Sequence, residues 1–298
     1  RSMQNINHPT ISTKGVVRPT LVEVDLDRLS DNFFAIQQEV APARVMAILK
    51  ANAYGHGVVP SAQLMQTLGA DSLGVAVLEE GLLLREAGIT APILVLGGIL
   101  GNQVPFFLEH NLAITASSVE KLEQIEAAAC RMGITARVHL KIDTGMERIG
   151  VHYYNAESLL ETSLKCRYLE VEGIYSHFAN ADLPDLSHAH LQLERFQEVL
   201  SFYEQRSLPT PLRHMANTAA ILQIPQTDFD IVRPGLLLYG VYPTQAIPHR
   251  VEVHPALTWK SHVVYFKVVK PGHPVSYGST WQTDHMVRVV TVPVGYGD

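Results

Sequence analysis

Lys50 is the residue whose type and position most strongly suggest chemistry. Three apolar residues, 47–49, lead directly into it, and a polar, glycine-bearing segment with Tyr54 follows. A lysine at the end of a buried strand is unusual, because its ammonium group loses hydration there. Lys50 is therefore either an ordinary lysine that reaches back to solvent or a nucleophile.

Polar side chains also end the other apolar, strand-like runs. They are mainly cations and hydrogen-bonding groups: Lys141, Asp143, Arg148, His177, His214, Asn217, Thr218 and Arg233. They show no metal-ligand spacing, so we predict no metal site. Arg233 could instead be a buried ion-pair partner, and His177 an ordinary core histidine.

The elements that must position these residues alternate in type. Helix-like segments, such as 118–133 and 191–206, separate most of the strand-like runs. The runs lie at residues 45–50, 72–77, 93–98, 112–116, 137–143, 169–178, 212–217 and 231–240. About eight parallel βα units predict an α/β fold, a closed (β/α)8 barrel with its active site at the carboxyl ends of the strands. A doubly wound open sheet is the alternative.

The character of the sequence changes after Gly240. The remaining residues are β-branched, aromatic and rich in turns, without intervening helices. We predict an N-terminal extension (1–18), a barrel domain (19–244) and a mainly-β domain (245–298). Because the chain stops just after a strand-like run, we expect the β domain to be incomplete at its C-terminus.

The composition narrows the class of protein. A hydrophobic content of 47% and a charged content of 17% predict a globular chain. The net charge of −6 includes no basic run, which argues against nucleic acid or an anionic membrane as a partner. We find no signal peptide or membrane span. Cys130 and Cys166 fit free thiols in a reducing compartment, so we expect a soluble, cytoplasmic protein.

A lysine in such a setting can form a Schiff base with a carbonyl cofactor, because nearby cations and partial burial favour its neutral amine. Pyridoxal phosphate is the aldehyde that we expect. Its phosphate needs a pocket, which in barrels is often built by the loops after strands seven and eight. Thr218, the N–H groups of Gly235 and Leu236, and the phenol of Tyr54 could form it.

Six motifs then carry a resemblance to a known family. They are AILKANAYGHG, KIDTGMERIG, YSHFANAD, HMANTAA, VRPGLLLYG and VSYGSTW, in order along the chain. The chain resembles the bacterial alanine racemases, pyridoxal-phosphate enzymes with an N-terminal barrel and a C-terminal β domain. The resemblance implies a homodimeric isomerase that interconverts L- and D-alanine and supplies D-alanine for peptidoglycan.

The resemblance also implies roles for individual residues. Lys50 would be the cofactor lysine and one catalytic base, and Tyr277 would be the second base, in the partner subunit's site. The cofactor-binding residues would be Lys50, Tyr54, His177, Asn217, Thr218, Arg233, Gly235 and Leu236, with Arg233 facing the pyridine nitrogen. The supporting residues would be Arg148, Lys141, His214 and Tyr296, the last lining the entrance.

Several alternatives stay open. Glu147 occupies a position where many family members have glycine, and Lys141 matches a lysine that is often carbamylated. Serine or broad-specificity racemase activity remains possible within the family. A pyridoxal-phosphate decarboxylase would need a carboxylate where Arg233 stands, and a barrel-only cofactor carrier would lack the β domain.

Overall fold

The computed structural model describes residues 18–298 and divides into two compact units. One unit is Asp25–Ala256. The described part of the other consists of residues 18–24 and 257–298. No helix among the described residues combines the length and apolar character needed to cross a bilayer.

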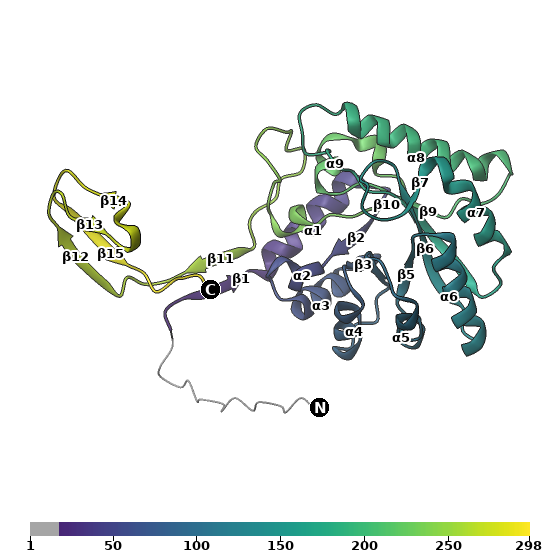
Figure 1. Ribbon diagram of the computed structural model, residues 1–298, viewed down its shortest axis with the longest axis horizontal. Coiled ribbons are helices and arrows are strands. Elements are labelled where there is room, and N and C mark those ends of the chain that lie inside the picture. Colours follow the sequence, from purple (N-terminus) through teal and green to yellow (C-terminus); the bar gives the residue numbers. More distant parts are fainter. Residues whose placement is uncertain (1–17) are drawn as a thin grey trace. The chain divides into compact units, whose positions relative to one another are not determined.

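The Asp25–Ala256 unit is a closed barrel of parallel strands (Figure 1). Each strand pairs with the next around the ring, and the pairing of β10 with β2 closes it. The barrel strands are β2 (Arg44–Ile48), β3 (Ser72–Val75), β4 (Ile93–Val95), β5 (Ala113–Ala116), β6 (Ala136–Asp143), β8 (Leu169–Tyr175), β9 (Leu212–His214) and β10 (Ile231–Val232). Closure confirms the predicted (β/α)8 barrel and rules out the open sheet.

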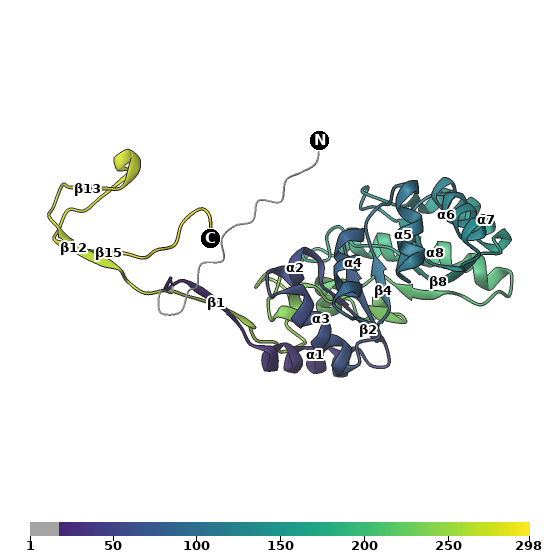
Figure 2. The same cartoon turned by 90° about the horizontal axis from the view of Figure 1, so that it is seen from below.

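Most of the helices lie around the outside of these strands (Figures 1 and 2). They are α1 (Leu26–Val40), α3 (Val58–Leu68), α4 (Leu78–Glu86), α5 (Val104–Glu109), α6 (Val119–Met132), α7 (Ala156–Lys165) and α8 (Ser187–Gln205). Two short helices, α2 (Lys50–Tyr54) and α9 (Thr218–Gln223), follow the carboxyl ends of β2 and β9. The single turns are η1 (Gly101–Gln103), η2 (Tyr153–Asn155), η3 (Pro225–Thr227) and η4 (Leu236–Tyr239), and a short strand, β7 (Val151–His152), pairs with β6.

Local sequence explains the predicted helix over 118–133, which is observed as α6. The Ser118 side chain accepts a hydrogen bond from the Lys121 N–H at 3.1 Å and so caps the amino end. Gly133 ends the helix with a φ of 66°, a left-handed conformation that glycine adopts without a Cβ penalty. Leu122 and Ile125 face the core and are fully buried.

The predicted strand over residues 231–240 is wrong beyond Val232. Only Ile231–Val232 pairs with its neighbours, and residues 236–239 form the 3-10 turn η4. Pro234 follows almost at once and has no N–H to donate to a strand ladder. Regular strand pairing therefore ends just before Arg233, and the last backbone bonds to the neighbouring segments come from the Arg233 N–H to the Ala216 carbonyl (2.9 Å) and from the Ile48 N–H to the Pro234 carbonyl (3.2 Å).

The second unit is built from antiparallel pairs, which confirms the predicted mainly-β domain after the barrel. The pairs are β1 (Leu21–Val24) with β11 (Leu257–Lys260), β12 (Tyr265–Val269) with β15 (Val287–Thr291), and β13 (Pro274–Val275) with β14 (Trp281–Gln282). Strand β1 precedes the barrel in sequence and nevertheless pairs with β11. The division at residues 19 and 245 stays a prediction.

The buried side chain of Asn32 links α1 to two later segments of the barrel unit, and this link can be tested. The side chain is 1% exposed; Nδ2 donates to the carbonyls of Leu238 (3.1 Å) and His254 (2.9 Å), and Oδ1 accepts from the His254 N–H (2.9 Å). Asn32→Ala leaves these backbone groups unpaired, so we expect the free energy of unfolding to fall by about 2–3 kcal/mol. Urea denaturation measures it. The neighbouring exposed Asp31→Ala should change it by less than about 0.5 kcal/mol, and equal effects of the two variants would contradict the prediction.

Candidate active site

A cavity of about 460 Å³ is lined by residues that follow or end the barrel strands. Five predicted site residues line it: Lys50, Lys141, Arg148, His177 and Arg233. The other lining residues are Ala76, Leu96, Gly97, Gly98, Ile149 and Tyr175. The structure therefore brings together five residues that lie up to 183 positions apart in sequence (50 to 233).

Lys50 begins a turn of left-handed helix. Ala51, Asn52, Ala53 and Tyr54 have φ values of 53°, 56°, 54° and 53°. Left-handed helical geometry costs an L-residue roughly 1–2 kcal/mol. Four such residues in a row persist only where surrounding contacts hold them, and strain of this kind is typical of functional sites.

Hydrogen bonds from both sides hold this turn. The Ala51 N–H donates to Oε1 of Glu80 at 2.6 Å, and the Val58 N–H donates to Oδ1 of Asn52 at 2.8 Å. Nδ1 of His56 lies 3.1 Å from the carbonyl oxygens of both Ala53 and Tyr54. Because carbonyls only accept, we assign the His56 proton to Nδ1.

The surroundings of Lys50 favour its neutral amine. Its side chain opens into the cavity, and partial burial, together with the charges of Arg148 and Arg233, lowers the pKa of its ammonium group, although the Glu80 carboxylate acts in the opposite direction. A lowered pKa makes the neutral amine, which is the nucleophilic and proton-accepting form of a lysine, more available.

Arg233 lies at the centre of the polar groups below the cavity. It is 4% exposed, and its Nη1 lies 3.0 Å from Nδ1 of His214. Its Nη2 lies 3.1 Å from Nδ1 of His177 and donates to the carbonyls of Ser176 (2.8 Å) and Met215 (3.3 Å). Burial lowers the pKa of Arg233 to about 10, so it stays charged at neutral pH. Among the described residues these bonds use only the terminal nitrogens, which leaves Nε–H available as a donor.

The donors of Arg233 fix the tautomers of a chain of histidines. Since arginine only donates, Nδ1 of His214 accepts, and its proton must be on Nε2, which lies 2.8 Å from Nδ1 of His139. The His139 proton is then on Nε2, 3.5 Å from Oε2 of Glu172. The same reasoning leaves His177 with its proton on Nε2. A polar chain thus runs from Glu172 through the barrel interior to Arg233.

Lys141 is buried beside the same charges. Burial and the positive charges of Arg233 and Arg148 hold its pKa well below the usual range, against the opposing charge of Asp143. Its Nζ lies 4.5 Å from the centre of the Tyr175 ring. This environment favours the neutral amine of Lys141 in the cavity wall.

Thr218, Gly235 and Tyr54 form a small polar cradle. The Thr218 Oγ1 accepts from the N–H groups of Gly235 and Leu237, at 3.2 Å each. A Cβ at Gly235 would lie 2.5 Å from the Tyr54 phenol oxygen, so only glycine fits without displacing Tyr54. Lys50 Nζ lies 5.9 Å from the Tyr54 ring centre. Asn217 caps α9, because its Oδ1 accepts from the Ala220 N–H at 3.0 Å, and Leu236 begins η4 beside Gly235.

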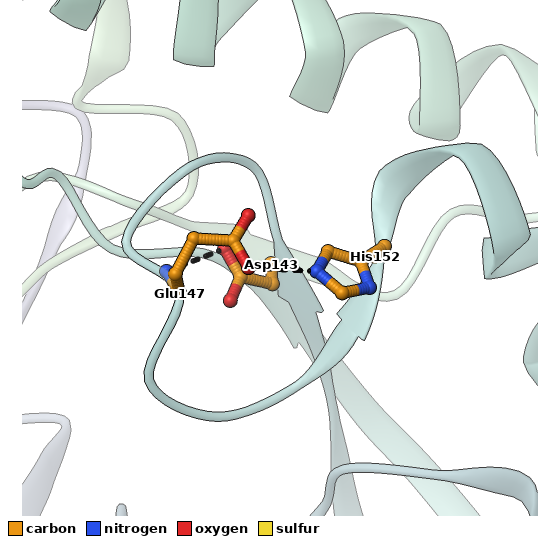
Figure 3. A group of neighbouring side chains, drawn as sticks. All are labelled: Asp143, Glu147 and His152. Atoms are coloured by element: carbon orange, nitrogen blue, oxygen red, sulfur yellow. Dashed lines mark hydrogen bonds and ion pairs between the residues drawn. The ribbon is translucent and has the colours of Figure 1, made fainter.

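The loop that carries Arg148 is held by Asp143, whose Oδ1 accepts from the N–H groups of Gly145 (2.9 Å), Met146 (3.0 Å) and Glu147 (3.2 Å). Glu147 has a φ of 54°, which explains why glycine suits this position. Its Oε2 lies 2.8 Å from Nε2 of His152. Figure 3 shows the three neighbouring side chains Asp143, Glu147 and His152. Asp143, Glu147 and His152 are close enough to hold an ion, but these contacts already occupy them, and we assign no metal there.

Tyr277 and Tyr296 lie in the other unit. Tyr277 begins the turn η5 (Tyr277–Ser279), and both side chains are fully exposed within the chain. Neither lines the barrel cavity. Their predicted roles therefore remain predictions.

Sequence reasoning missed several residues of the site. Tyr175 lines the cavity, stacks on His214 at 4.6 Å, and has its pKa raised to about 12 by burial. The only signal was its place two residues before His177 at the end of a strand. The sequence did not indicate a role for Glu80 or His139, because their partners in the site, Ala51 and His214, lie 29 and 75 residues away.

Fold and site together define the class: a (β/α)8-barrel enzyme with a cation-rich pocket around a lysine at the carboxyl end of the barrel, joined to a β domain. Comparison with known families is specific. Residues 24–243 match the N-terminal domain of alanine racemase, and residues 256–298 match its C-terminal domain. The chain belongs to the alanine racemase family, which confirms the resemblance and the expected enzyme class, an isomerase.

Individual relatives and solved structures are similar to this chain over most of its length. The alanine racemase of Carboxydothermus hydrogenoformans is 43% identical over 283 residues, which cover 95% of this chain and 77% of that protein. The structure of alanine racemase from the D-cycloserine-producing Streptomyces lavendulae matches with a TM-score of 0.89 at 36% identity, covering 95% of this chain and 75% of that one. A histidine racemase from Leuconostoc mesenteroides matches with a TM-score of 0.82 at 30% identity, covering 99% and 77%.

The buried histidines predict how stability depends on pH. Burial is the largest cause that lowers the pKa values of His139, His177 and His214, and Arg233 lowers them further. The unfolded chain therefore binds more protons below about pH 6.5, and stability is lost as the pH falls below that value, by up to about 1.4 kcal/mol per unit for each histidine. His214→Gln removes one such contribution. The free energy of unfolding, measured by urea titration, should therefore fall less between pH 7 and pH 5.5 in this variant than in the parent chain. The exposed His190→Gln is the control, and the same pH dependence in both variants would refute the prediction.

Proposed function

We propose that the chain is a pyridoxal-phosphate-dependent racemase that interconverts L- and D-alanine. One observation carries the proposal: Lys50, with a lowered pKa, lines a cavity with Arg148 and Arg233 and lies beside the Thr218–Gly235–Tyr54 cradle. Membership of the alanine racemase family supports the same reaction.

The residues present fit the cofactor. Lys50 would hold its aldehyde carbon, and the cradle would hold its phosphate through the hydroxyls of Thr218 and Tyr54 and the N–H groups of Gly235 and Leu236. Arg233 would use Nε–H toward the pyridine nitrogen, with His177 beside the ring, Asn217 fixing α9, and Arg148 near the phenolic oxygen. Bound pyridoxal phosphate supplies an electron sink for charge that develops at the substrate α-carbon.

Arg233 sets the strength of that sink. An arginine keeps its proton, so it cannot protonate the pyridine nitrogen as a carboxylic acid would. His214 and the backbone carbonyls of Ser176 and Met215 fix its orientation. Because Arg233 would leave the pyridine nitrogen unprotonated, the electron sink would be weaker, which suits an enzyme that only inverts a centre.

Inversion needs two bases on opposite faces of the α-carbon. The Nζ of Lys50 would take or return the proton on one face, and Tyr277 of the partner subunit would do so on the other. A phenol is a weak base unless its phenolate is stabilised. The Nε2–H of His177 is a donor suited to that task, beside the charge of Arg233. A shared site requires a homodimer.

Lys141 is proposed to be carbamylated. Its neutral amine is the form that reacts with carbon dioxide, and the product would be an anion able to pair with Arg148. Tyr296 lining the entrance, a role in peptidoglycan supply and a cytoplasmic location likewise remain predictions.

The similar proteins do not all act on the same amino acid, because the matched structures include a histidine racemase. The substrate is therefore the least restricted part of the proposal. A second candidate function is therefore a broad-specificity or serine racemase of the same fold. Incubation of the cofactor-loaded protein with L-alanine, L-serine, L-lysine and L-histidine, with separation of the enantiomers, tests both. We expect alanine to racemise fastest. Faster turnover of another amino acid would overturn alanine as the substrate, and carbon dioxide release would indicate a decarboxylase.

The cradle predicts a non-additive pair of variants. Gly235→Ala introduces a Cβ that displaces the Tyr54 hydroxyl, so cofactor affinity should fall by about 10- to 100-fold, the loss of one charge-assisted hydrogen bond. Tyr54→Phe should cost a similar amount. Because the clashing oxygen is then absent, adding Gly235→Ala to Tyr54→Phe should cost little more. Equilibrium titration with pyridoxal phosphate measures this, and additive losses would contradict the shared contact.

The two-base proposal predicts exchange without inversion. Tyr277→Ala removes the base on one face only, so racemisation should fall by about 10²–10⁴-fold. In deuterated water this variant should still replace the α-proton of D-alanine through Lys50 and return labelled D-alanine. Mass spectrometry and chiral chromatography measure the two rates. Loss of exchange together with inversion, while the cofactor stays bound, would refute these roles.

Subunit mixing tests the shared site. Lys50→Ala and Tyr277→Ala chains are each inactive in this proposal, but a mixed dimer contains one intact site. Activity should therefore return on mixing once subunits exchange. No recovery after demonstrated exchange would argue against Tyr277 serving the partner's site.

A further inference from the structure

Glu80 lies outside the set of residues that the cofactor would touch, yet it joins two parts of the site. Its Oε1 accepts from the Ala51 N–H at 2.6 Å, within the left-handed turn that follows Lys50. Its Oε2 accepts from the Ala76 N–H at 2.7 Å, in the loop after β3. Ala76 itself lines the cavity, and its carbonyl accepts from the Gly97 N–H at 3.1 Å. One carboxylate therefore links the lysine turn to the cavity wall.

We propose that Glu80 is a positioning residue for Lys50: its carboxylate holds the strained turn that carries the lysine and places a negative charge near it. The assignment of Lys50 as the reacting lysine rests on the proposed function. The link itself rests on the two hydrogen bonds of Glu80 and needs no cofactor.

Strain is the reason why such a link is needed. Four consecutive L-residues in left-handed geometry return to ordinary geometry unless they are held. The Ala51 N–H is the first donor after Lys50, so the bond to Glu80 acts next to the lysine's own backbone. The other contacts, from Asn52 and His56, hold the later part of the turn.

The charge of Glu80 adds a second effect. Burial and the charges of Arg148 and Arg233 lower the pKa of Lys50, and Glu80 raises it. Lys141 and His177 line the same cavity, and burial with the neighbouring arginines lowers the pKa of both groups and so disfavours their charged forms. Glu80 therefore limits how far the pKa of Lys50 falls.

A competing explanation is that Glu80 only caps α4. It is the third residue of that helix, and its Oε2 also lies 3.4 Å from the Val77 N–H at the helix start. A cap would protect residues 78–86 and would leave residues 50–57 unaffected. The two explanations therefore predict changes in different segments.

Hydrogen–deuterium exchange of the chain without added cofactor separates them. Glu80→Ala should accelerate exchange of the segment 50–57 by about 10- to 100-fold, the loss of a charge-assisted hydrogen bond. The matched control is Glu79→Ala, which changes an exposed carboxylate in the same helical turn and should leave 50–57 unchanged. Faster exchange confined to 78–86 would overturn the proposal.

Reactivity of Lys50 provides a second readout, in a variant that keeps the size of the side chain. Glu80→Gln removes the negative charge, so competitive acetylation followed by peptide mapping should show Lys50 reacting about 3- to 10-fold faster at a fixed pH below its pKa. Glu79→Gln should match the parent chain. Unchanged Lys50 reactivity in Glu80→Gln would overturn the proposal. If another lysine proved to hold the cofactor, the proposed function would fail, while both of these readouts would be unaffected.

Discussion

The buried charge of Arg233 is the interaction on which the rest of the site depends. It lowers the pKa values of Lys50, Lys141, His177 and His214, in each case together with burial. Its donors also fix which nitrogen of His177 and His214 carries the proton. Two of its neighbours, His214 and the Met215 carbonyl, lie at or just beyond the end of β9, and the Ser176 carbonyl follows β8. Closure of the barrel therefore determines the position of this charge and, through it, the protonation of the pocket.

A second constraint is that Lys50 must be both reactive and fixed. The arginines and partial burial favour its neutral amine, whereas the left-handed turn after it limits where the amine can go. The contacts that hold the turn come from α4, from the start of α3 and from His56. Folding of the whole barrel thus compensates for local strain that an isolated segment could not maintain.

Sequence patterns predicted much of this arrangement, for identifiable reasons. The eight strands are short apolar runs between amphipathic helices, and parallel strands bring their carboxyl ends together. The sequence alone therefore groups Lys50, Lys141, Arg148, His177 and Arg233. The left-handed turn, the His214–His139–Glu172 chain and the pairing of β1 with β11 could not be predicted, because each depends on contacts between distant segments. The strand expected over 231–240 ended early because apolar composition alone does not separate a strand from a 3-10 turn after proline.

In the proposed function, this environment selects the partly exposed Lys50, and not the fully buried Lys141, as the amine that holds pyridoxal phosphate. The most direct test is to load the chain with the cofactor, reduce it with borohydride, digest it and map the labelled peptide by mass spectrometry. We expect a label on Lys50, and none on Lys141 even in a Lys50→Ala chain that still binds the cofactor. A label on Lys141 in the parent chain, with Lys50 unmodified, would contradict it.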